Sequence, residues 1–401
     1  MTTTPLADAK RAAFTLAAAL AVIGSAPPIA ISMGALAGVY LLGPDKSLAT
    51  APVTTFNVGT AIGALIAGWL GQMIGRKQSF MSGALITSLG GASAAAALFS
   101  GSFVFFALAL MVIGLGSGFA QQFRFAAADN SPSVFKAQAI SWVLGGGIVS
   151  AILGPQAVIF TKDMFLPVEF AGAYMSIILF GLIGFAILSF LKLEPALRPA
   201  AGEVRDTGRP LGQIIASPRF LTALVCGVSS YALMSLVMTG APLAMVGCGF
   251  SVNEATLGIQ WHVLAMFAPS FFTGKLIARY RKETIVAIGL VILIACAFVA
   301  LNGIQLWNFW LSLILLGLGW NFGFIGATAM VTDCYRPEEK GKVQGFHDFI
   351  LFGTVALSSL MSGKIYNVWG WDALNWMILP VTGVCLLALF WLVAARRKAA
   401  A

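Results

Sequence analysis

Charged residues are scarce in this sequence. Asp, Glu, Lys and Arg make up only 10 % of its 401 residues, whereas soluble domains carry about 25 %. Apolar residues account for 59 % of the chain, and 44 glycines come in addition. So little charge cannot cover a water-facing surface, and so much apolar content excludes a disordered protein. The class that remains is a polytopic membrane protein.

Patterns that bind metals or cofactors are missing as well. The five cysteines have no metal-ligand or redox spacing, and one is left over from any pairing, so we interpret them as small apolar residues. The sequence contains no Walker loop, no HExxH zinc motif and no nucleophile elbow. We therefore expect no cofactor, no metal and no enzymatic activity. The cysteines are Cys226, Cys248, Cys296, Cys334 and Cys385.

Long apolar stretches are abundant and fall into two sets of six. Each is long enough to cross a hydrocarbon core of about 30 Å as a helix rising 1.5 Å per residue. A single helix can cross the hydrocarbon core because all its backbone hydrogen bonds are made within the helix. We predict an all-α membrane protein with twelve transmembrane helices. The stretches are 12–42, 48–70, 79–100, 102–128, 137–160 and 168–191, then 219–247, 252–277, 284–303, 306–333, 343–366 and 371–395.

The net charge of +9 is explained by orientation. If the N-terminus is cytoplasmic, 20 of the 24 basic residues lie in cytoplasmic segments, three lie outside, and Arg124 lies within a span. This bias follows the positive-inside rule and places both termini in the cytoplasm. A nucleic-acid partner is not expected, because the basic residues do not cluster on a soluble module.

The longest polar segment, 192–218, contains four prolines and both charge signs. We interpret it as a cytoplasmic linker. It predicts an N-terminal six-helix bundle over 1–191 and a C-terminal six-helix bundle over 219–401.

The two halves repeat one another weakly. Gly68-Trp69-Leu70 matches Gly274-Lys275-Leu276 at an offset of 206, and Gly114-Leu115-Gly116 matches Gly317-Leu318-Gly319 at an offset of 203. Nearly constant offsets indicate a duplicated bundle with pseudo-symmetry.

With twelve spans in two sixes, a central linker and a glycine-basic loop from Gly68 to Lys77, the sequence resembles the major facilitator superfamily over its whole length. That loop has Gln72 and Met73 where the family usually has Asp and Arg. The resemblance implies a secondary transporter, usually a monomer, that rocks one bundle against the other around a central site. It also implies a cavity lined chiefly by the first, fourth, seventh and tenth helices.

A looser resemblance to a group that includes bacterial riboflavin transporters favours flavin uptake across the bacterial inner membrane. The implied partners are a small-molecule substrate, membrane lipid and protons as the coupling ion. The alternative is proton-coupled efflux of drugs or metabolites. It rests on Gly154-Pro155, which resembles the start of the family's antiporter motif.

Gln121, Gln122 and Arg124 stand near the end of the fourth predicted span. A guanidinium there could bind an anionic or carbonyl-bearing solute, and the two amides add hydrogen-bonding groups. The alternative is that Arg124 snorkels to the membrane interface.

His347 and Asp348 stand near the start of the eleventh predicted span. Asp348 is the expected partner of Arg124 in a gate between the halves, and protonation of the carboxylate would weaken that pair. The alternative is a carboxylate and an imidazole that face water at a helix start.

His262 lies ten residues into the eighth predicted span, near the membrane midplane. Because histidine titrates near neutral pH, it could couple transport to protons. The alternative is a neutral histidine that hydrogen-bonds to a neighbouring helix.

Tyr231, Trp320 and Asn321 are the remaining substrate-binding candidates. Trp320 and Tyr231 offer stacking surfaces for a planar ring, and Asn321 can both donate and accept hydrogen bonds. The alternative is packing between helices or against lipid.

Overall fold

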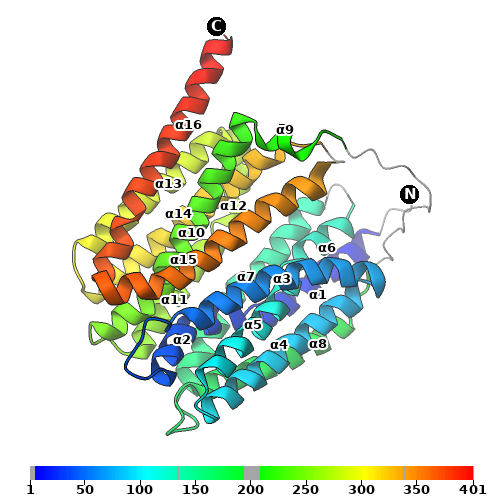
Figure 1. The fold of residues 1–401 in the computed structure, drawn as a ribbon. Helices are drawn as coiled ribbons and strands as arrows, with labels where there is room; N and C mark the ends of the chain where they lie inside the picture. The colour runs from blue at the N-terminus through cyan, green and yellow to red at the C-terminus, as the bar shows by residue number, and fades with distance from the viewer. Residues whose placement is uncertain (1–4, 133–134, 194–207, 337–338, 401) are drawn as a thin grey trace.

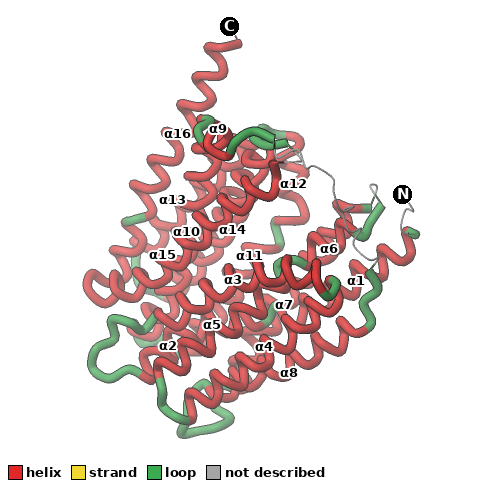
Figure 2. Tube along the Cα trace, turned by 45° about the vertical axis from the view of Figure 1, so that its right-hand side comes forward, coloured by secondary structure: helices red, strands yellow, loops and turns green. Residues whose placement is uncertain are grey.

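The computed structural model describes residues 5–132, 135–193, 208–336 and 339–400. Within these ranges the chain consists of helices and loops, without a strand (Figure 1; Figure 2). The all-α prediction is therefore confirmed. Residues 194–207 of the predicted linker lie outside the described residues, and the boundaries drawn at 191 and 219 remain predictions.

Eight helices precede the predicted linker. Of the other eight, α9 lies within the linker and seven come after α9. The first eight are α1 (Leu6–Ile23), α2 (Ala26–Leu41), α3 (Ala51–Met73), α4 (Arg76–Phe99), α5 (Phe103–Ala120), α6 (Phe123–Asp129), α7 (Lys136–Thr161) and α8 (Ala171–Ser189). The others are α9 (Leu211–Ile215), α10 (Pro218–Gly247), α11 (Val252–Phe267), α12 (Ser270–Arg279), α13 (Lys282–Leu301), α14 (Leu306–Thr332), α15 (Lys340–Trp376) and α16 (Ile378–Ala400).

The helices account for the twelve predicted spans. Ten helical stretches in the described residues are long and apolar enough to cross a membrane. One of them, Lys342–Arg396, contains two spans, because Gly370 breaks the helix with φ 80° and ψ −174°. The eighth predicted span supplies the twelfth, since it is divided into α11 and α12 and neither part is long enough alone.

The first span is divided into two helices. The helix stops after Ile23, and α2 starts again with prolines in its first turn. Proline suits that position because its missing N–H would have no partner in the first turn of a helix. A Cβ on Gly154 would lie 2.7 Å from the Ser25 carbonyl oxygen, so α7 packs directly against this break.

The eighth span breaks at Ala268-Pro269. Proline cannot continue the helical ladder, and it leaves carbonyls of the preceding turn without their N–H partners. The Nδ2 group of Asn321, on α14, donates a hydrogen bond of 2.7 Å to the Met266 carbonyl. A side chain of a neighbouring helix thus stabilises the break.

Buried apolar side chains divide into clusters that follow the two halves. One cluster belongs to α9–α16 with the single addition of Ala151, and two clusters belong to α1–α8 with the single addition of Leu243. The described chain therefore forms two helical bundles. Below, these are the N-terminal bundle (α1–α8) and the C-terminal bundle (α10–α16).

The two bundles are joined at one end of the molecule. We call the end that carries the start of α1, the end of α16 and α9 the termini end, and the opposite end the far end (Figure 1). Five hydrogen bonds between described residues join the bundles, and all lie toward the far end. They pair Thr50 with Leu360, Thr54 and Asn57 with Ser359, Gln156 with Gln260, and Asn367 with Lys46.

Equivalent ion pairs at the termini end support the internal repeat. In the N-terminal bundle Arg76 lies 2.7 Å from Asp129, and in the C-terminal bundle Lys282 lies 2.6 Å from Asp333. The positions of the two pairs differ by 206 and 204 residues. The glycine-basic loop therefore retains an ion pair despite Gln72 and Met73.

A cavity between the two bundles

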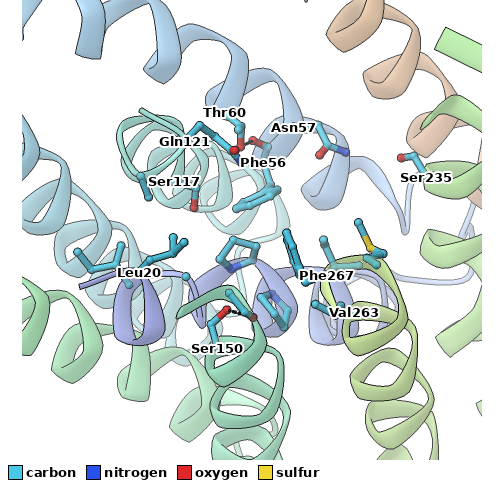
Figure 3. Close-up of a pocket in the computed structure, with 18 of the residues that line it drawn as sticks. Leu20, Phe56, Asn57, Thr60, Ser117, Gln121, Ser150, Ser235, Val263 and Phe267 are labelled. Carbon is cyan, nitrogen blue, oxygen red and sulfur yellow. Dashed lines mark hydrogen bonds between the residues drawn. The ribbon is translucent and has the colours of Figure 1, made fainter. Parts of the chain in front are cut away.

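A cavity of about 180 Å³ lies between the bundles (Figure 3). It has room for roughly a dozen water molecules, because each needs about 15 Å³ of such a cavity. Its lining comes from α1, α2, α3, α5, α6 and α7 of the N-terminal bundle and from α10, α11 and α15 of the C-terminal bundle. The described residues of α14 do not line it, so the expectation that the tenth span lines the cavity is wrong.

The polar side chains of the lining are concentrated on the N-terminal bundle. That bundle contributes two amides, three hydroxyls and one guanidinium. They are Asn57, Thr60, Ser117, Gln121, Arg124 and Ser150.

Several of these groups already make one hydrogen bond. Thr60, Ser117 and Ser150 donate to carbonyls of their own helices, at 3.0, 3.1 and 2.8 Å. A hydroxyl that donates in this way keeps its oxygen lone pairs for another donor. The hydroxyls therefore present acceptors to the cavity.

The C-terminal bundle lines the opposite wall mainly with apolar, sulfur-containing and aromatic side chains. Ser235 and the phenol of Tyr231 are its polar groups among the lining residues. The apolar members are Met234, Met238, Val263, Met266, Phe267, Phe352 and Val355.

The predicted Gln121, Gln122 and Arg124 segment is only partly in the cavity. The fourth span is interrupted at Gln121-Gln122, between α5 and α6, and Gln121 and Arg124 line the cavity while Gln122 does not. The Nε group of Arg124 is enclosed and lacks a hydrogen-bond partner among the described residues. Its guanidinium lies 4.8 Å from the ring centre of Phe125.

Asp348 does not form the expected ion pair in this conformation. Its side chain is 58 % exposed, and Oδ1 lies 3.0 Å from Nδ1 of His347, which is only 5 % exposed. No ion pair or hydrogen bond joins Asp348 to Arg124 among the described residues. On α15 the side chain of Asp348 points outward and that of His347 points inward. Neither residue lines the cavity.

Tyr231 lines the cavity, and Trp320 lies behind it. The rings of Tyr231 and Trp320 are 5.3 Å apart, and Trp320 stacks on Phe324 at 5.2 Å with an interplanar angle of 18°. Phe352, which also lines the cavity, lies 6.3 Å from Tyr231. Trp320 thus supports the aromatic wall without touching the cavity.

Asn321 and His262 are buried away from the cavity. Asn321 donates to Met266 and Ser270 and accepts from Thr273, so its amide holds the α11–α12 break. His262 has no exposed surface, and its Nδ1 lies 2.8 Å from the Leu313 carbonyl. An Nδ1–H that donates to a carbonyl suits the neutral packing alternative.

Several lining residues were not predicted from the sequence, above all Asn57 and Thr60 on α3. Asn57 is the one amide in the predicted span 48–70, and a polar amide within a span is a functional signal. Thr60 lies one turn further along the same face. Ser117 and Ser150 carried no such signal, because serine is common where helices pack in membranes.

The architecture, the duplicated ion pairs and the cavity between the bundles define a class. A sequence profile of the Major Facilitator Superfamily matches residues 12–352 and 262–401, and the chain belongs to that family. It is a multi-pass membrane protein and a secondary transporter, not an enzyme.

One sequence relative and two solved structures show which members of the family this chain resembles. The chain is 49 % identical over 381 residues to the riboflavin transporter RfnT of Brucella anthropi, which covers 95 % of each chain. The fold resembles the crystal structure of a D-xylose-proton symporter, with a TM-score of 0.73, 13 % identity and coverage of 94 % of this chain and 96 % of that one. It also resembles the nucleoside transporter NupG, with a TM-score of 0.71, 14 % identity and coverage of 94 % and 99 %.

Proposed function

We propose that this chain takes up riboflavin across the bacterial inner membrane by alternating access. The similarity to the Brucella anthropi riboflavin transporter supports this substrate. The observation that carries the proposal is the unequal division of polar side chains between the walls of a largely apolar cavity, with six on the N-terminal bundle and two on the C-terminal bundle. Riboflavin has the same division, since a planar isoalloxazine ring carries a ribityl chain of hydroxyls.

The polar wall suits the ribityl chain. Its hydroxyl groups are donors, and the oxygens of Thr60, Ser117 and Ser150 offer acceptors because their own protons are already engaged. Gln121 can act in both directions. A binding site built in this way rejects analogues that lack the hydroxyls, because the buried acceptors would lose their partners.

Arg124 suits the carbonyl edge of the ring. The guanidinium carries donors, and its Nε has no partner among the described residues although it is enclosed. Hydrogen bonds from a charged donor are stronger than neutral ones, at about 1.5–3 kcal/mol. A ring carbonyl at this position would satisfy the buried donor.

The apolar wall suits the faces of the ring. Tyr231 and Phe352 expose aromatic surface to the cavity, and Trp320 fixes Tyr231 from behind. Met234, Met238 and Met266 supply flexible, polarizable surface that adapts to a flat ligand and makes favourable contacts with aromatic rings.

The direction of access follows from the orientation we propose, with both termini in the cytoplasm and the chain acting as a monomer. The bundles are joined at the far end, so in this orientation the cavity is separated from the outside and faces the cytoplasm. Arg124 and Asp348 then pair when the termini end closes. Protonation of Asp348 weakens that pair and links closure to the proton gradient.

Uptake of radiolabelled riboflavin by a riboflavin-auxotrophic host that expresses the chain tests the proposal. We expect growth at low external riboflavin. Arg124→Gln should raise KM about 10- to 150-fold, which corresponds to the loss of one charge-assisted hydrogen bond. Asp348→Asn should instead slow turnover with little change in KM, because Asp348 lies outside the cavity.

Gln122→Ala is the matched control, since Gln122 neighbours Arg124 but does not line the cavity. Its uptake kinetics should equal those of the unaltered chain. Absence of growth rescue by the unaltered, membrane-inserted chain would refute riboflavin uptake. Drug resistance conferred on a pump-deficient strain would then favour the efflux alternative.

A further inference from the structure

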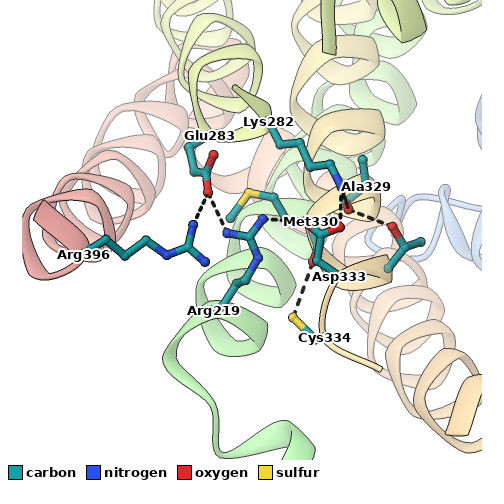
Figure 4. Close-up of polar contacts among 9 residues, drawn as sticks. Arg219, Lys282, Glu283, Ala329, Met330, Asp333, Cys334 and Arg396 are labelled. Carbon is teal, nitrogen blue, oxygen red and sulfur yellow. Dashed lines mark hydrogen bonds and ion pairs between the residues drawn. The ribbon is translucent and has the colours of Figure 1, made fainter. Parts of the chain in front are cut away.

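A second hollow, of about 630 Å³, lies at the termini end of the C-terminal bundle, far from the central cavity. It is formed where α10 and α13 begin and where α12, α14 and α16 end (Figure 4). We call it the basic pocket. It takes no part in the function proposed above.

Positive charge dominates the basic pocket. Five cations line it, namely Arg219, Arg279, Arg281, Lys282 and Arg396, against two carboxylates. Its lining therefore carries a formal charge of +3. An excess of this size in one concave site attracts anions.

The two carboxylates form ion pairs with three of the cations. Glu283 accepts from Arg219 at 2.7 Å and from Arg396 at 2.9 Å. Asp333 accepts from Arg219 and, at 2.6 Å, from Lys282 (Figure 4). This network forms the floor of the pocket and engages three of its five cations.

Two arginines and one buried N–H remain without an anionic partner. Arg279 and Arg281 are exposed, and neither has a carboxylate within ion-pair distance among the described residues. The Arg279 guanidinium lies 5.6 Å from the ring centre of Tyr280. The Nε of Arg219 is enclosed without a hydrogen-bond partner. The donors of the pocket thus exceed its acceptors.

We propose that the basic pocket binds the phosphate of an anionic lipid headgroup. Planar guanidinium groups match phosphate oxygens in pairs, so Arg279 and Arg281 can each hold a phosphate through two hydrogen bonds. Basic pockets between membrane-crossing helices are the geometry that such headgroups require.

The surroundings favour a lipid over a soluble phosphate. Ile277 and Val393 extend the lining with apolar surface, and Phe390 and Trp391, on the same helix as Arg396, are 74 % and 60 % exposed. The end of α16 extends beyond the other helices at the termini end (Figure 1). Acyl chains gain from contact with such a surface, whereas a free phosphate does not.

Native mass spectrometry of the full chain, stripped of lipid and then offered phosphatidylglycerol and phosphatidylcholine with identical acyl chains, tests the proposal. The unaltered chain should retain phosphatidylglycerol preferentially. Each arginine near a membrane surface strengthens binding of an anionic lipid about fivefold. Arg279→Gln with Arg281→Gln should therefore weaken phosphatidylglycerol binding about 25-fold and leave phosphatidylcholine binding unchanged.

Lys136→Gln with Lys275→Gln is the matched control. It removes two cations from the same end of the molecule but outside the pocket, and the lipid preference should persist. An equal loss in both double variants, or no preference in the unaltered chain, overturns the proposal. Displacement of phosphatidylglycerol by an equal concentration of inorganic phosphate overturns the lipid source and assigns the pocket to soluble phosphate.

A second measurement avoids any variant that fails to fold. Phenylglyoxal modifies accessible arginines, and peptide mapping reports Arg279 and Arg281 separately. Vesicles that contain phosphatidylglycerol should protect both residues in the reconstituted chain, whereas phosphatidylcholine vesicles should not. Equal modification in the two vesicles contradicts the proposal.

Discussion

Ser359 joins the two bundles at the far end. Its hydroxyl donates to the Ala356 carbonyl of its own helix at 2.9 Å. The same oxygen lies 3.1 Å from the Thr54 hydroxyl and accepts from Asn57 Nδ2 at 3.3 Å. Ser359 therefore makes two hydrogen bonds to the opposite bundle. Ser359→Ala should release the far end.

The size of the effect follows from the hydrogen bonds lost. Each contributes about 0.5–1.5 kcal/mol net, so the loss of two shifts the free energy between the closed and open far end by about 1–3 kcal/mol. At 25 °C this corresponds to a population ratio that rises about 5- to 150-fold in favour of the open far end. Because both partners lie on the opposite bundle, the folding of each bundle should change little.

Double electron–electron resonance measures the distance between spin labels at Leu48 and Val368, and the distance distribution reports this population ratio. Both side chains are exposed, at 51 % and 61 %, and belong to opposite bundles near the contact. With the native cysteines replaced, the Ser359→Ala chain should show a larger long-distance population.

Ser358→Ala is the matched control, because Ser358 makes no hydrogen bond to the other bundle among the described residues. Equal distance distributions for the two variants would refute the reasoning.

Two further predictions concern stability. Asn321→Ala should lower the free energy of unfolding of the purified chain by about 1–3 kcal/mol, because the α11–α12 break loses its hydrogen bonds. The KM for riboflavin should stay unchanged. A raised KM would instead make Asn321 a ligand of the substrate. The hydrogen bonds from Arg209 lower the pKa of Glu339 well below its usual value. A lowered folded-state pKa gives stability that is complete above the unfolded value near 4.3 and is lost as the pH falls below it. Melting temperatures between pH 3 and 7 should therefore fall more steeply on acidification in the unaltered chain than in Glu339→Gln, and parallel curves would contradict this.

The sequence alone predicted the architecture because membrane insertion is a local, compositional requirement. Each span must be apolar over about twenty residues and must satisfy its own backbone. These requirements can be counted along the chain, and the helices follow the predicted stretches closely. The break before Pro27-Pro28 also has a local cause, because proline acts on its own helix.

The site was only partly predictable, as the fate of its candidates shows. Arg124, Gln121 and Tyr231 line the cavity, whereas Gln122, one residue away from Gln121, does not. Trp320 and Asn321 have the same residue types as ligand-binding side chains but support Tyr231 and the α11–α12 break. Residue type identifies what a side chain can do, and the face of the helix on which it lies decides where it does so.

Asn57 and Ser359 make the same point for contacts between the halves. They are 302 positions apart, and each is an ordinary polar residue within an apolar stretch. The number of spans and the duplication were determined by the sequence itself, because each depends on composition or on a repeat. The walls of the cavity and the joined far end were decided by tertiary structure, because they depend on how two separately encoded bundles pack against each other.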